Sequence, residues 1–140
     1  MKSLVNFYNE NNCIPVNQKG SNSERLSARS YLYNTLGLNK MALKDISVCE
    51  VGPGTGQNAL DLSSRGIKSL QLIEPTNAGQ QRCNQLKQNQ DFQSEVDLYS
   101  GTVEEYICKN QNSNKFDLVV TEGLVGSSGY EKPLELFDSI

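Results

Sequence analysis

Short runs of apolar residues alternate along most of this chain with longer stretches whose apolar residues recur at helical spacing. Short apolar runs bounded by turn residues predict buried strands, and apolar residues at helical intervals predict amphipathic helices. We expect strands at 46–51, 69–73, 96–99 and 116–121, with helices between them at 57–65, at 76–88 and from Thr102 onward. Strands that alternate with helices predict an α/β fold with a mostly parallel, doubly wound sheet.

The residues before the first expected strand form a different part of the chain. The first 22 residues are polar and rich in asparagine, and a helix is expected over about 24–36. Its apolar residues that fall roughly on one face are Leu26, Tyr33 and Leu36. Because 140 residues suffice for one domain, we expect an N-terminal helical extension at 1–44 followed by the sheet domain at 45–140.

The C-terminal residues end inside an apolar pattern. A last helix is expected after Pro133, with Leu134, Phe137 and Ile140 among its residues. We therefore expect a sheet that is truncated after its fourth strand, with the outer edge of 116–121 left without a pairing partner. This edge is apolar and contains no proline or lysine, so edge pairing into a homo-oligomer is expected.

Charge narrows the class of ligand. The chain has 13 Lys and Arg against 16 Asp and Glu, a net charge of −3, and it lacks histidine. Residues 1–44 carry six positive and two negative side chains, whereas residues 45–140 carry seven positive and fourteen negative ones, so the larger part of the chain is acidic. An acidic body argues against nucleic acid as a partner and is compatible with a small cationic ligand. Without histidine, His-based catalytic triads and His metal sites are excluded.

The cysteines give a prediction about metal and compartment. Cys13, Cys49, Cys83 and Cys108 are widely separated, and no Cys-x-x-Cys pair occurs. We therefore expect no zinc site. Isolated thiols are typical of a reducing compartment, and no apolar run is long enough for a signal peptide or a membrane span. The sequence thus favours a soluble, cytoplasmic protein without a membrane partner.

The strongest chemical signal is a glycine-rich heptad between the first expected strand and the first expected helix. It runs from Glu50 to Gly56 as Glu-Val-Gly-Pro-Gly-Thr-Gly. Glycine lets a backbone approach a ligand closely. The dinucleotide fingerprint would need a glycine where this chain has Gln57, and a phosphate-binding P-loop would need a lysine that is absent. An acidic-x-Gly-x-Gly-x-Gly pattern remains.

This heptad resembles the first motif of class I S-adenosylmethionine-dependent methyltransferases, and three more motifs follow in that family's order. Glu74 closes the second expected strand, where the family places the carboxylate that binds both ribose hydroxyls. Residues 101–104 stand where the family contacts adenine, and 116–122 resemble the motif that faces the methyl group and substrate. The resemblance covers about 45–125. It implies a Rossmann-like sheet in the order 3-2-1-4-5-7-6, of which this chain holds the first four strands.

The resemblance implies S-adenosylmethionine as cofactor and assigns the residues that bind it. They are Glu50, Gly52, Pro53, Gly54, Gly56, Glu74, Thr102 and Val103. Glu122 is the candidate catalytic residue, although it could equally just end a strand. Thr102 stands where the family commonly has Asp, and a capping box with Glu105 would explain it without any ligand. The glycines could form only a tight turn, and Glu74 could be an ordinary solvated carboxylate.

The expected function is methyl transfer to a small-molecule or sugar nucleophile. Residues 121–124 lack the Asn/Asp-Pro-Pro-aromatic signature of enzymes that methylate DNA bases. Glu122 and Glu131 are nine residues apart, which resembles the two-glutamate loop of protein arginine methyltransferases, so such an enzyme is one alternative. A non-catalytic S-adenosylmethionine-binding or interaction module is another. Because substrate-positioning segments are expected beyond Ile140, the 140-residue chain alone is expected to be inactive.

Overall fold

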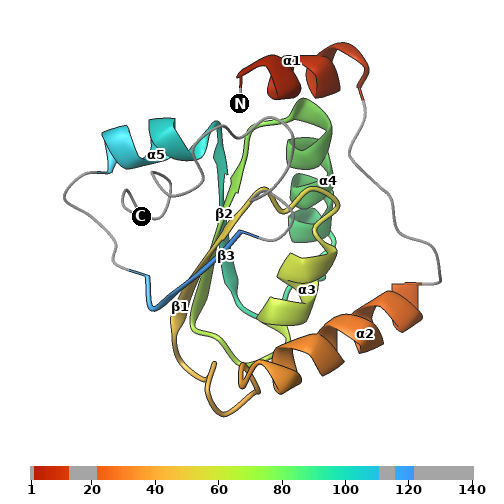
Figure 1. The fold of residues 1–140 in the computed structure, drawn as a ribbon, viewed down its shortest axis with the longest axis vertical. Coiled ribbons are helices and arrows are strands. Elements are labelled where there is room, and N and C mark those ends of the chain that lie inside the picture. Colours follow the sequence, from red (N-terminus) through yellow and green to blue (C-terminus); the bar gives the residue numbers. More distant parts are fainter. Residues whose placement is uncertain (1, 13–21, 111–115, 122–140) are drawn as a thin grey trace.

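The structure, a computed structural model, describes residues 2–12, 22–110 and 116–121. The expected alternation of strands and helices is present (Figure 1). In chain order, the elements are α1 (Lys2–Glu10), α2 (Asn22–Thr35), β1 (Ser47–Val51), α3 (Gln57–Ser63), β2 (Ser69–Glu74), α4 (Asn77–Gln88), β3 (Glu95–Ser100), α5 (Val103–Lys109) and β4 (Leu118–Val120). No helix among these is long and apolar enough to cross a bilayer.

The strands form a four-stranded sheet in the order β3-β2-β1-β4, and every pairing is parallel. This confirms the predicted parallel sheet. The fourth strand is shorter than the expected 116–121: it spans Leu118–Val120 and pairs with Val48–Glu50 of β1. Asp117, just before β4, makes two hydrogen bonds with Ser47. Its backbone N–H donates to the Ser47 carbonyl at 2.9 Å, and its side chain accepts from the Ser47 N–H at 2.8 Å.

Helices cover both faces of the sheet (Figure 1). Helices α2, α3 and α4 lie on one side and α5 lies on the other. Since side chains alternate along a strand, each face has its own core. One contains Val48, Leu70 and Leu72 with α3 and α4 side chains, and the other contains Cys49, Val51 and Ile73 with Val103 and Tyr106 of α5. The result is a three-layered α/β arrangement with apolar contacts on both sides of β1 and β2.

Helix α2 packs onto the same core as the sheet. Tyr33 of α2 and Leu43 of the following turn are buried with Val48. The expectation that Leu36 shares the buried face of Tyr33 is wrong, because Leu36 is 63% exposed. The helix ends at Thr35, and Gly37 adopts a φ of +80° that turns the chain away from the helix axis.

A buried arginine connects α2 to α3. The Arg65 side chain is 2% exposed and pairs with Asp61, with Nε and Oδ2 2.8 Å apart. Its guanidinium also donates to the Leu38 carbonyl, the Ser30 hydroxyl and the Asn34 side-chain oxygen, and it lies 5.1 Å from the centre of the Tyr33 ring. One side chain from the turn after α3 therefore satisfies acceptors from α2 and from the turn that follows α2.

The first helix was not predicted, because its sequence is polar and rich in asparagine. Helix α1 lies beside the first turn of α4 at the end of the sheet where the strands finish (Figure 1). The Asn9 side chain accepts a hydrogen bond from the backbone N–H of Asn77, at 2.8 Å. This contact caps one of the N-terminal amides of α4 from a residue 68 positions away.

Candidate functional site

The candidate site lies at the carboxyl edge of the sheet, where β1, β2 and β3 end. The connection after β1 leads to α3 on one face, and α5 on the other face precedes β4 on the far side of β1. The chain therefore changes direction between β1 and β4. In open parallel sheets, ligands bind at such a switch point, outside the carboxyl ends of the strands.

The glycines after β1 form a turn that other residues would strain. Gly52, Gly54 and Gly56 have φ values of +72°, +55° and +74°, all in the left-handed region. The Gly52 N–H donates to the carbonyl of Ile73 in β2, at 2.9 Å. A Cβ on Gly56 would also lie 2.5 Å from Leu86 Cδ1. The turn is thus held against β2 and α4 at the carboxyl edge of the sheet, with Gly52, Gly54 and Thr55 half-buried.

Glu74, at the end of β2, meets this glycine turn. Its side chain is buried at 3% exposure, and Oε2 accepts a hydrogen bond from the Gly54 N–H at 2.9 Å. Its other oxygen accepts from the N–H and the hydroxyl of Thr76, at 2.8 and 2.6 Å. The structure thus brings together Gly54 and Glu74, which the sequence placed in one site. Glu74 is not the ordinary solvated carboxylate of the alternative interpretation.

Two residues that the sequence analysis missed hold the Glu74 carboxylate in place. Thr76 caps α4, and its hydroxyl also accepts from the Gly79 N–H. Gly79 leaves room for the carboxylate, since a Cβ there would lie 2.5 Å from Glu74 Cδ. A glycine in the first turn of a helix is unfavourable by propensity. That departure is the signal by which sequence reasoning could have found Gly79.

Glu50 is the second buried carboxylate of the site. It lies near the end of β1 at 2% exposure, and its Oε1 accepts from the side-chain amide of Asn58 at 2.9 Å. The oxygen of Asn58 in turn accepts from the Tyr33 hydroxyl at 2.6 Å. Asn58 and Tyr33 were not among the predicted site residues. No sequence pattern marks them, because their partners come from three different elements.

The residues predicted after β3 have a structural role. Thr102 and Glu105 form the predicted capping box at the start of α5. Val103 is buried in the core beneath α5. Contact of Thr102 or Val103 with a ligand stays a prediction. Glu122, the candidate catalytic residue, lies outside the described residues.

The pKa values of the buried thiols Cys83 and Cys49 reflect the negative charge of this region. Burial, followed by the nearby carboxylates of Glu74 and Glu50, raises the pKa of Cys83 to about 12, although Arg82 acts to lower it. Burial, with a smaller effect of Glu50, likewise raises the pKa of Cys49 to about 12. Both carboxylates therefore act on the same buried space, and a cation would be more favourable there than an anion.

Thiol labelling at pH 8 is expected to separate the described cysteines. Cys108 is exposed, whereas Cys49 and Cys83 are buried with raised pKa values. Because the thiolate is the reactive form, iodoacetamide should modify Cys108 at least about 10³ times faster than the other two. Peptide mapping by mass spectrometry would measure the rates. Equal labelling of Cys83 and Cys108 in the native protein would contradict the structure.

No group of three metal-binding side chains occurs within residues 2–12, 22–110 and 116–121. A groove of about 590 Å³ lies between α2, α3 and α4, and none of the predicted site residues lines it. The groove therefore does not belong to the carboxyl-edge site.

Comparison with known proteins identifies the fold. Neither a protein-family model nor a curated protein sequence matches the chain. A putative methyltransferase from Escherichia coli superposes with a TM-score of 0.63 at 16% identity, over 90% of this chain and 64% of that one. The protein arginine methyltransferase 10 of Arabidopsis thaliana gives a TM-score of 0.52 at 21% identity, over 70% of this chain and 26% of that one.

A third similar structure is the PRMT1 enzyme-prozyme complex of Trypanosoma brucei with AdoHcy. It gives a TM-score of 0.53 at 21% identity, over 71% of this chain and 30% of that one. The chain spans less than two thirds of the length of each of the three structures. The described part of the chain has the class I methyltransferase fold, as the four motifs predicted.

Proposed function

We propose that the carboxyl-edge site binds S-adenosylmethionine and that the whole protein transfers its methyl group to a nucleophile. The observation that carries this proposal is the junction of Glu74 with Gly54. It joins a buried carboxylate at the end of β2 to the glycine turn after β1, across a hydrogen bond of 2.9 Å. The similar PRMT1 enzyme-prozyme complex with AdoHcy supports the same ligand class.

The residues at this edge suit the chemistry of that cofactor. A carboxylate offers two acceptor oxygens to the two neighbouring ribose hydroxyls. Glu74 already accepts from Gly54 and Thr76, so we propose that ribose displaces the Gly54 N–H from Oε2. The buried carboxylates of Glu50 and Glu74 favour a ligand that carries positive charge, and S-adenosylmethionine carries a sulfonium and an ammonium group.

The proposed chemistry asks the protein mainly for alignment. The sulfonium of S-adenosylmethionine supplies an activated methyl group, so no histidine is needed to start the reaction. The glycine turn and Glu74 would hold the cofactor, and the backbone beside Val103 would lie against adenine. Fixing donor and acceptor in line is then the main source of rate enhancement. We propose a small-molecule or sugar acceptor, because the sequence from residue 45 onward is acidic.

Replacing Glu74 by alanine is expected to weaken binding of S-adenosylhomocysteine at least about tenfold. Each hydrogen bond to a charged acceptor contributes about 1.5–3 kcal/mol, and 1.4 kcal/mol corresponds to a factor of ten. Isothermal titration calorimetry would measure both dissociation constants. Glu95→Ala is the matched control, because Glu95 is exposed at the start of β3, at the opposite end of that strand from the candidate site. Circular dichroism would check that both variants fold.

Three outcomes would decide against parts of the proposal. Binding of NADH without binding of S-adenosylhomocysteine would refute the proposed cofactor. Equal affinity in Glu74→Ala and Glu95→Ala would refute the role of Glu74. Tight binding without transfer of a radiolabelled methyl group by the whole protein would support a binding module instead of an enzyme.

A further inference from the structure

We infer that Tyr33 and Asn58 are positioning residues for Glu50, so that helix α2 sets the carboxylate on which the cofactor site depends. The inference deepens the proposed function and rests on it. It assigns a role in the site to a helix that the sequence analysis placed in a separate N-terminal extension.

The chain of hydrogen bonds has a fixed direction. An ionised carboxylate only accepts, so Asn58 must turn its NH₂ group toward Glu50 Oε1, at 2.9 Å. The oxygen of the same amide then faces α2 and can only accept. The Tyr33 hydroxyl donates to it at 2.6 Å. A tyrosine on α2 thus selects one of the two orientations of the Asn58 amide, and that orientation suits the carboxylate.

All three side chains are shielded from water. Tyr33, Asn58 and Glu50 are 5%, 4% and 2% exposed. Water therefore cannot readily replace a lost partner, and each bond depends on the one before it. Through these buried hydrogen bonds, the position of Tyr33 determines the orientation of the Glu50 side chain.

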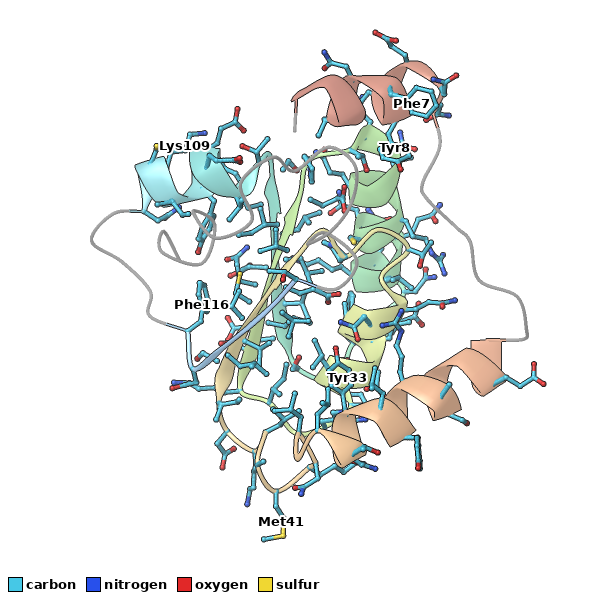
Figure 2. All side chains as sticks on the ribbon, viewed as in Figure 1. Phe7, Tyr8, Tyr33, Met41, Lys109 and Phe116 are labelled. Carbon is cyan, nitrogen blue, oxygen red and sulfur yellow. The ribbon has the colours of Figure 1, made fainter. Side chains whose placement is uncertain are left out.

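Helix α2 holds the Tyr33 hydroxyl firmly. The ring packs in the core with Leu43 and Val48, and the Arg65 guanidinium lies 5.1 Å from its centre. Tyr33 extends from α2 toward α3, whereas Met41, in the turn that follows, extends away from the protein (Figure 2). Phenylalanine would fill the same core space, so the hydroxyl adds a polar contact that packing alone does not require.

The series of hydrogen bonds ends at Glu50, beside the glycine turn. Glu50 is two residues before Gly52 and is paired in the ladder with both β2 and β4. Its backbone is therefore fixed, and the rotamer of its side chain is the remaining freedom. Asn58 removes that freedom from the α3 side. Helix α2 acts on the site through this rotamer, without itself being required to touch the ligand.

A double-mutant cycle on S-adenosylhomocysteine affinity tests the inference. The variants are Tyr33→Phe, Glu50→Gln and the two combined, and the control is Tyr31→Phe, which removes a hydroxyl from a residue that is 76% exposed on the same helix. We expect Tyr33→Phe to weaken binding about fivefold and Tyr31→Phe less than about twofold. In the Glu50→Gln background, Tyr33→Phe should change affinity by less than about twofold.

The cycle distinguishes positioning from stability. If Tyr33 supported only the fold, Tyr33→Phe would weaken binding equally with and without Glu50→Gln, and that result would overturn the inference. Unchanged affinity in Tyr33→Phe would also overturn it, while leaving the proposed function standing if Glu74→Ala still loses affinity. If the wild-type chain does not bind S-adenosylhomocysteine, the proposed function fails and the inference falls with it.

Two further measurements keep the test decisive. If Tyr33→Phe does not fold, Asn58→Ala can replace it. This variant breaks the series of hydrogen bonds at its middle residue, and alanine is a good helix former in α3. The same fivefold loss, absent in the Glu50→Gln background, would support the inference, and an unchanged affinity would refute it. Where Glu50→Gln binds too weakly for calorimetry, the rise in melting temperature with millimolar ligand gives the affinity.

Discussion

Replacing Arg65 by methionine is expected to lower the free energy of unfolding by about 3–5 kcal/mol. Methionine keeps much of the apolar stem but leaves Asp61, at 6% exposure, buried without its positive partner. An uncompensated buried charge costs about this much. The substitution also leaves the Leu38 carbonyl and the Ser30 hydroxyl without their donor. Urea unfolding followed by circular dichroism would measure the change.

A control variant and a compensating double variant test this expected loss of stability. Lys68→Met removes an exposed cation three residues away, and its effect should stay within about 0.5 kcal/mol. Combining Arg65→Met with Asp61→Leu should recover most of the loss, because replacing a whole buried pair by apolar residues is often close to neutral. If Arg65→Met is as stable as Lys68→Met, the arginine does not join α2 to α3 in the way described.

Replacing Gly79 by alanine is expected to destabilise the protein and weaken ligand binding, although alanine is the better helix former. Helix propensity alone predicts a gain of about 1 kcal/mol for Gly→Ala in α4. The new Cβ, however, would lie 2.5 Å from Cδ and 2.7 Å from Cγ of Glu74. Overpacking of this kind costs about 1–3 kcal/mol, and the carboxylate would have to leave Thr76 and Gly54. We therefore expect net destabilisation and at least about tenfold weaker binding of S-adenosylhomocysteine.

The sign of the change in stability separates the gain in helix propensity from the clash with Glu74. A second substitution tests whether Glu74 causes the clash. In the Glu74→Ala background the obstructing side chain is gone, so adding Gly79→Ala should stabilise the protein by about 1 kcal/mol. Thermal unfolding of the four proteins would measure this reversal. A stabilising Gly79→Ala in the otherwise unchanged chain would show that the glycine is not needed to accommodate Glu74.

Much of the fold could be predicted because its signals are local. The strands at β1, β2 and β3 and the helices between them agree with the expected ranges to within two residues. The capping box of Thr102 with Glu105 is present as predicted. Two predictions failed. Leu36 is exposed because α2 ends at Thr35, just before it, and α1 formed from a polar segment that contacts α4.

The candidate site was predicted only in its outline. The glycine pattern and the position of Glu74 at the end of a strand placed Gly54 and Glu74 at one edge, since the carboxyl ends of parallel strands meet there. Their hydrogen bond joins residues 20 positions apart. The surroundings of Glu74 depend on the position of α4. Thr76 donates hydrogen bonds to its carboxylate and Gly79 leaves space for it.

The sequence by itself determined the order of strands and helices, the parallel sheet and the glycine turn, because periodicity, caps and glycine preferences act over a few residues. Only the tertiary structure decided which polar groups are buried together. Arg65 meets acceptors up to 35 positions away, and Tyr33 meets Asn58 25 positions away. Such partners leave no periodic trace in a chain, because a hydrogen bond depends on the packed distance between two groups and not on their spacing in sequence.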